Sequence, residues 1–298
     1  MTHARKTAGD FPPEVLKLFD GYVHGALTRR DFLDRAARYA VGTFTAAAML
    51  ESLQPNFAWA RQVAKDDARI RTEYATYESP RGSGTMRGYF AAPARATSRL
   101  PGVVVIHENR GLNPYIEDVV RRLAVANFVA FAPDALTPVG GYPGDEDRGR
   151  ELFAKQDAGK RLEDLFAAVP YLRSRAECNG RFGAIGFCFG GGVVNAMAVR
   201  MPELAAGVPF YGAQPATADV PNIKAPLQIH YASEDERINA GWPAFEAALK
   251  AAGTRYEMHL YPKTQHGFHN DTTPRYDEAA AKLAWQRTLT FFDAHLRG

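Results

Sequence analysis

A single cysteine lies within a glycine-rich run at residues 185–192, which read IGFCFGGG. An apolar stretch precedes Cys188 and a helical pattern follows it, and this order of elements is typical of a nucleophile elbow, with cysteine in the usual place of serine. Gly186 and Gly190 leave room for the strand and the helix to approach each other. The amides and dipole at the start of the following helix favour a thiolate. The pattern predicts a nucleophilic thiol, and the structural alternative is an inert, buried cysteine on a glycine-rich turn.

Phosphate-binding loops also combine glycines with a strand and a helix, but their motifs are missing here. No Gly-Lys-Ser/Thr follows the glycines at residues 190–192, and Gly-x-Gly-x-x-Gly is not matched. The glycine run therefore indicates close backbone packing around a thiol.

A thiol nucleophile needs a base, and the base needs an acid that orients it. In hydrolases with a nucleophile elbow, these residues follow in the chain order nucleophile, acid, histidine. Asp235 follows an apolar run at residues 227–231, and His266 follows another at residues 256–261. Both positions are expected on loops at the carboxyl ends of strands, where parallel sheets carry their sites. We predict that Asp235 and His266 are the partners of Cys188.

Neighbouring residues offer alternatives for both roles. His269 is a second candidate for the base, and Glu234 or Glu236 could replace Asp235 as the acid. His230 and His259 fall inside predicted strands, so we expect them to be structural.

Residues 107–111, with the sequence HENRG, follow the apolar run at 102–107. In folds with a nucleophile elbow, this position supplies one amide of the oxyanion hole, which binds negative charge as it develops on the carbonyl oxygen. We predict that the amides of Asn109 and Phe189 form this pair. The segment is not a zinc helix, because the second histidine of His-Glu-x-x-His is absent.

Apolar runs alternate with helical patterns from about residue 70 onward, which predicts an α/β fold. The first two expected strands are split by the turn-forming sequence SPRGSG, which indicates an antiparallel hairpin. We expect one domain with a mostly parallel sheet, this N-terminal hairpin, and helices on both faces. Strands are expected at residues 71–78, 86–92, 102–107, 128–133, 182–187, 206–210, 227–231 and 256–261, and helices at 115–126, 162–173, 191–200, 242–252 and 276–295.

The first 60 residues differ from the rest. A twin-arginine pattern, TRRDFL at residues 28–33, precedes an uncharged run at 39–50 and the small-x-small sequence Ala58-Trp59-Ala60. This order predicts an export leader at 1–60, cleaved after Ala60, followed by a hydrolase domain at 61–298 in the periplasm. The run is too short to span a bilayer. The alternative is a cytoplasmic protein in which this segment is an amphipathic helix packed on the domain.

Composition limits the partners. The chain has 298 residues with a net charge of +3, and no basic block suggests nucleic-acid binding. Its two cysteines flank a predicted strand about 20 Å long, which is too far for a disulfide. A small-molecule substrate is expected, with no metal or organic cofactor and no membrane span, and a homodimer is left open.

Taken together, these motifs resemble those of the dienelactone hydrolase family, cysteine members of the α/β-hydrolase fold. The resemblance covers residues 70–298 and depends on HENRG at 107–111, GFCFGGG at 186–192, Asp235, and HGF at 266–268. It implies a Cys188–Asp235–His266 triad that hydrolyses esters or lactones through an acyl-thioester. It also implies that Glu108 contacts the resting thiol and helps to deprotonate it.

The chain departs from the family where the reference enzymes bind a substrate carboxylate with two arginines. Residues 135–138 read ALTP and residues 269–271 read HND in those places. Arg110, Arg148 and Arg275 are the candidates to compensate, and Arg110 is the nearest to the predicted site in sequence. Ester or lactone hydrolysis is expected, without dienelactone as the particular substrate.

Two other functions compete with this one. A glutaminase-type cysteine enzyme also uses a Gly-x-Cys-x-Gly elbow, but its late His-x-Glu pair is missing. A non-catalytic ligand-binding protein on the same fold would not need the complete set of Cys188, Asp235 and His266.

Overall fold

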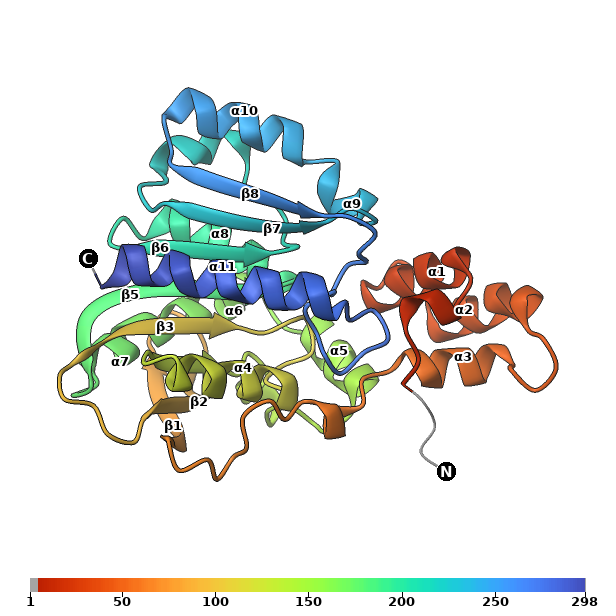
Figure 1. Cartoon of the computed structure of the whole chain (residues 1–298), viewed down its shortest axis with the longest axis horizontal. Coiled ribbons are helices and arrows are strands. Elements are labelled where there is room, and N and C mark those ends of the chain that lie inside the picture. The colour runs from red at the N-terminus through yellow and green to blue at the C-terminus, as the bar shows by residue number, and fades with distance from the viewer. Residues whose placement is uncertain (1–4, 298) are drawn as a thin grey trace.

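The computed structural model describes residues 5–297. Its centre is an eight-stranded sheet in the order β1-β2-β4-β3-β5-β6-β7-β8 (Figure 1). From β4 to β8 all neighbouring strands are parallel, whereas β2 is antiparallel to both β1 and β4. The strands are β1 (Ile70–Ser79), β2 (Gly84–Pro93), β3 (Leu100–Ile106), β4 (Val129–Pro133), β5 (Cys178–Phe187), β6 (Ala206–Phe210), β7 (Leu227–Ala232) and β8 (Tyr256–Tyr261).

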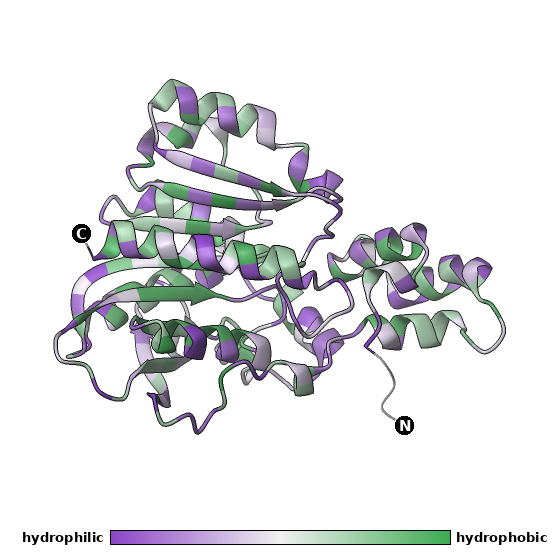
Figure 2. Ribbon diagram, viewed as in Figure 1, coloured by the Kyte–Doolittle hydropathy of each residue, from purple (hydrophilic) through white to green (hydrophobic). Residues whose placement is uncertain are grey.

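Helices cover both faces of the sheet. Apolar side chains of α4 and α11 pack on one face, and those of α7, α8 and α10 pack on the other. Figure 2 shows the apolar character of the central strands against more polar connecting loops. The helices are α4 (Pro114–Val125), α5 (Glu146–Ala154), α6 (Ala158–Phe166), α7 (Ala168–Ser174), α8 (Phe189–Arg200), α9 (Glu236–Asn239), α10 (Trp242–Ala252) and α11 (Glu278–Leu296).

The predicted fold class is confirmed, including the antiparallel hairpin formed by β1 and β2. The single helix predicted at residues 162–173 is wrong, because the chain breaks at Ala167 into α6 and α7. Pro170 explains the break, since it has no N–H to donate to the carbonyl four residues earlier. Helix α5 was not predicted, although Asp145 caps it by accepting from the Arg148 amide.

The N-terminal residues form a separate helical unit, which we call the N-terminal unit and define as residues 8–53. It contains α1 (Pro13–Val23), α2 (Arg29–Ala36) and α3 (Ala46–Leu53), which lie beyond the carboxyl ends of the strands (Figure 1). Phe19, Tyr22 and Phe32 lie at the centre of an apolar cluster made only of residues from this unit. The unit therefore has a core of its own.

The residues of the twin-arginine pattern have a structural place in this unit. Thr28 caps α2 by accepting from the Asp31 amide, and Arg29 and Arg30 are the first two residues of that helix. Beyond the unit, Ala60 is buried with the sheet's apolar core. Export and cleavage after Ala60 remain predictions. Within residues 5–297, no helix combines the length and the apolar character that crossing a membrane requires.

Candidate active site

The elbow around Cys188 joins β5 to α8 and is tightly packed. Cys188 has φ 55° and ψ −114°, a strained combination for a residue with a side chain. A Cβ atom on Gly186 would lie 2.1 Å from the Gly190 oxygen, and one on Gly190 would lie 2.2 Å from the Ile106 oxygen. These two glycines are therefore required for strand and helix to meet, and the turn presents the thiol at the carboxyl end of the sheet.

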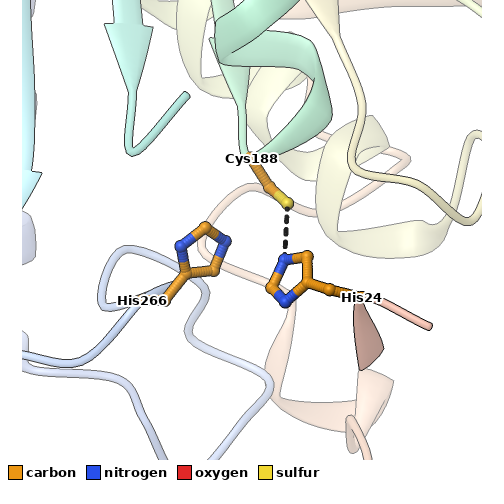
Figure 3. Close-up of side chains that lie close together, drawn as sticks. All are labelled: His24, Cys188 and His266. Carbon is orange, nitrogen blue, oxygen red and sulfur yellow. Dashed lines mark hydrogen bonds between the residues drawn. The ribbon is translucent and has the colours of Figure 1, made fainter. Parts of the chain in front are cut away.

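Asp235 and His266 meet as predicted. The Nδ1–H of His266 donates to Asp235 Oδ2 at 2.5 Å, and both side chains are buried. This bond leaves Nε2 on the other side of the ring, where it has no hydrogen-bond partner within the described protein. In Figure 3 the His266 ring lies beside Cys188. The structure thus brings the thiol, the imidazole and the carboxylate together, while their catalytic roles remain predictions.

The charges in this group favour an ion pair. Burial raises the pKa of the Cys188 thiol, but two nearby imidazoles outweigh that effect and hold the pKa well below its ordinary value. Burial likewise opposes protonation of His266, yet Cys188 and Asp235 raise its pKa to about 10. Both shifts favour a thiolate beside an imidazolium.

The second imidazole belongs to His24, which the sequence analysis assigned to the leader. His24 Nε2 lies 3.3 Å from Cys188 Sγ (Figure 3), and its Nδ1 lies 2.8 Å from the Asp20 carbonyl and 3.1 Å from Asp20 Oδ1. Burial disfavours the imidazolium, but Cys188 and Asp20 raise the His24 pKa overall. The i,i+4 spacing of Asp20 and His24 at the end of a helix was the available sequence signal, because it puts both on one face.

The two predicted oxyanion donors lie on the expected elements. Phe189 is the first residue of α8, so its N–H has no acceptor within the helix. Asn109 lies between β3 and α4, and its side chain donates to the Val23 carbonyl of the N-terminal unit at 2.9 Å. Their role as oxyanion donors remains a prediction.

Glu108 is buried near Cys188. Its Oε2 accepts from Asn270 Nδ2 at 3.1 Å. Burial and the negative charge of Cys188 raise its pKa. This carboxyl group is therefore suited to hold a proton close to the thiol.

The three candidate arginines have different surroundings. Arg148 is exposed and pairs with Glu151. Arg110, expected to reach a substrate, is buried and pairs with Glu146 at 3.0 Å. Arg275, which the sequence analysis named as an alternative to Arg110, is also buried, and its Nε and Nη1 have no hydrogen-bond acceptor within the described residues.

The alternative base and acids lie elsewhere. His269 is buried against Tyr115, whose hydroxyl lies 2.7 Å from its Nδ1, and burial lowers its pKa well below the ordinary value. Glu234 and Glu236 are exposed. None of the three contacts Asp235 or Cys188 as His266 does.

His230 and His259 lie in β7 and β8, as expected of structural residues. His230 Nδ1 lies 2.9 Å from the Tyr261 hydroxyl inside the core.

A metal ion could use the same atoms in principle. The ligand atoms of His24, Cys188 and His266 lie within 4.8 Å of one another, and thiolate and imidazole are zinc ligands. However, Arg237 Nη2 lies 3.1 Å from His24 Nε2. A guanidinium on that nitrogen disfavours a second cation at the site.

Two protein-family models match parts of the chain. The dienelactone hydrolase family model matches residues 86–296, and a YqhI-like model matches residues 1–40. A protein of Salmonella typhi named as a carboxymethylenebutenolidase is 31% identical over 228 residues, which are 72% of this chain and 84% of that protein. YghX of Escherichia coli, named as a hydrolase fragment, is 56% identical over 113 residues, 38% of this chain and 97% of the fragment.

Among solved structures, one named as a dienelactone hydrolase from Klebsiella pneumoniae is 28% identical with a TM-score of 0.66, and the match covers 74% of this chain and 98% of that one. The family model and the Salmonella relative both extend across most of the sheet and its helices. The chain therefore belongs to the dienelactone hydrolase family and is an ester or lactone hydrolase of that kind.

Proposed function

We propose that this protein hydrolyses its ester or lactone substrate through a thioester on Cys188, with His266 as the base and Asp235 as its orienting acid. The observation that carries this proposal is the free Nε2 of His266 beside a thiol held on a strained elbow, with Asp235 on the opposite ring nitrogen. The same order of roles defines triads on unrelated folds.

The chemistry follows from these positions. The Cys188 thiolate attacks the acyl carbon, and the amides of Asn109 and Phe189 bind the negative charge on the oxygen. Collapse of the intermediate expels the alcohol, which takes its proton from His266 Nε2. His266 then removes a proton from water, which attacks the thioester and releases the acid and the thiolate.

Glu108 has a supporting role in this proposal. The family resemblance implies that it contacts the resting thiol, and its burial next to Cys188 agrees with that. With a raised pKa, its carboxyl group can hold a proton beside the Cys188 thiolate. Asn270 holds its carboxyl group in place.

The name of the Salmonella relative describes a lactone that bears a carboxylate. A carboxylate entering the cleft loses its hydration and needs a cation. Arg110 was our expectation for that cation, but Glu146 already pairs with it. Arg275 lines the same cavity as His266, and its Nε and Nη1 have no hydrogen-bond acceptor within the described residues, although Nη1 lies 4.0 Å from Asp20 Oδ1. Arg275 is therefore the better candidate, and we propose an anionic lactone or ester as the substrate class.

The experiment is acid quenching during turnover of an aryl ester, followed by peptide mass spectrometry. We expect the acyl group on the peptide that carries Cys188, and its accumulation in the Asp235→Asn variant, because thioester hydrolysis needs a correctly oriented base. An acyl group on any other residue would contradict the proposal. The peptide with Cys178, the only other cysteine, is the internal control.

A further inference from the structure

Residues 20–24 of the N-terminal unit contact the groups that a substrate would use. His24 Nε2 lies 3.3 Å from Cys188 Sγ, where an acyl carbon must approach to about 3–3.5 Å. The other contacts come from residues within four positions of His24. The Val23 carbonyl accepts from the side chain of Asn109, on the predicted oxyanion loop.

Asp20 also contacts groups that a substrate would use. Its Oδ2 lies 3.6 Å from Arg237 Nε and its Oδ1 lies 4.0 Å from Arg275 Nη1. A carboxylate of the protein thus lies beside the same arginine that we propose for the substrate carboxylate. One short segment therefore covers the nucleophile, the oxyanion loop and the cation together.

Burial shows that the site is closed in this arrangement. Cys188 is 9% exposed and His266 is 4% exposed. A cavity of about 210 Å³ remains between α1 and the loops that carry Asp235 and His266, but Cys188 is not among its lining residues. A substrate confined to that cavity would not reach the sulfur.

The N-terminal unit is built so that it can move away as a body. Its apolar cluster contains no residue of the sheet domain, so its core would survive separation. Its contacts with the domain are largely polar, as at interfaces between domains that move relative to each other. Besides the four contacts above, they include a hydrogen bond from Arg150 Nη1 to the Tyr22 carbonyl at 2.7 Å and the ion pair of Arg29 with Asp147.

We propose that the N-terminal unit is a lid whose residues 20–24 occupy the substrate's position, so that the hydrolase is latent until the lid opens. This inference rests on the proposed function for the identity of the covered groups. Substrate and lid compete for the same atoms, and the observed activity is then scaled by the fraction of molecules in which the lid is open. The lid lies outside the residues matched by the family model, so it is an addition to the hydrolase domain.

The test loosens the lid without changing the groups at the sulfur. Arg150→Met removes the hydrogen bond to the Tyr22 carbonyl and the guanidinium above the Tyr22 ring, and it keeps most of the side-chain volume. Arg148→Met is the matched control, because Arg148 lies on the same helix but is exposed and pairs only within that helix. Both are measured in the full-length chain.

Two rates are measured: alkylation of Cys188 by iodoacetamide, followed by peptide mass spectrometry, and kcat/KM for a small neutral aryl ester. We expect Arg150→Met to raise both about tenfold or more, the equivalent of one charged hydrogen bond. Arg148→Met should leave both unchanged. If alkylation and turnover are unchanged or slower in Arg150→Met, the lid proposal is wrong. The N-terminal unit would then contribute to the active form of the site.

His24→Gly is the second variant in case Arg150→Met fails to fold. It removes the ring that covers the sulfur, so alkylation should again be faster than in the wild type when both are measured at a pH where the thiol is ionised. Alkylation reports access to the thiol whether or not Cys188 is the nucleophile. A failure of the lid is therefore distinguishable from a failure of the proposed hydrolytic mechanism.

Discussion

The sheet domain and the N-terminal unit differ in how their structure is held together. The domain has two continuous apolar layers, one on each face of an eight-stranded sheet. The N-terminal unit has a small core of its own and is attached to the domain mainly by hydrogen bonds and ion pairs. The first region holds Cys188 on a tightly packed turn, whereas the second covers it through contacts that can be broken singly.

The sheet domain carries the groups proposed for the chemistry, and the N-terminal unit controls access to them. The chemistry is built into the sheet domain, where the elbow and two loops hold Cys188, Asp235 and His266. Access to that chemistry is controlled by a unit with little shared core. Small helical units of this size are marginally stable on their own, so polar contacts can decide where the unit lies.

The largest expected effect lies within the sheet domain. His266→Ala should lower kcat/KM by about 10³ or more, because triad members act as a unit. Asp235→Asn should cost less than His266→Ala, since it keeps the shape but disturbs the imidazole tautomer. His269→Gln is the control, and steady-state kinetics on an aryl ester is the measurement. If His269→Gln loses more activity than His266→Ala, the base has been assigned to the wrong histidine.

A core substitution in each region tests whether the regions are separate. Phe32→Ala removes a fully buried ring from the N-terminal unit and should cost about 3–5 kcal/mol. We expect residues 8–53 to unfold locally while the sheet stays folded, as measured by amide hydrogen exchange. Phe131→Ala, in β4, should destabilise the domain instead. A single cooperative loss of the whole chain in Phe32→Ala would show that the two regions form one unit.

Substitution of the two buried arginines shows which one serves the substrate. Arg275→Met should cost about 1.5–3 kcal/mol in kcat/KM with an acidic lactone and far less with a neutral ester, the scale of a charged hydrogen bond. Arg110→Met should affect both substrates alike, because it leaves Glu146 buried without its partner. A selective loss with the acidic lactone in Arg110→Met would restore our original expectation for that residue.

A smaller effect is expected from pH. The pKa of Cys188 is lowered, so the thiolate persists below the range in which an ordinary thiol near pKa 8.5 gains its proton. Alkylation of Cys188 should therefore change little between about pH 8 and pH 6, whereas an ordinary thiol would slow by nearly two orders of magnitude. A slowing of that size in the wild type would mean that the imidazoles do not stabilise the thiolate.

Most of the sheet domain could be predicted because its signals are local. Apolar runs of strand length, the glycines around Cys188 and loops that end strands all lie within short windows of sequence. Position at the carboxyl end of a parallel sheet then brought Asp235 and His266 to the thiol. The break between α6 and α7 was not predicted, because the helical pattern continues across it and only Pro170 marks it.

The N-terminal unit could not be predicted in this way. The contact of His24 with Cys188 joins residues 164 positions apart, and no periodic pattern encodes where a separate unit will dock. The same residues, two arginines followed by an uncharged run, are compatible with a leader and with capped helices. The burial of Arg275 was missed for the same reason, since the ring of Phe19 from α1 lies against its guanidinium.

The most direct test of the central claim is turnover by the full-length Cys188→Ala and Cys178→Ala variants on a short aryl ester. Both cysteines are free and buried, so each substitution removes one thiol of comparable size. We expect Cys188→Ala to lose a factor of about 10³ or more in kcat with its fold intact by circular dichroism, and Cys178→Ala to remain close to the wild type. If Cys188→Ala keeps more than about a tenth of the activity, Cys188 is not the nucleophile of this hydrolase.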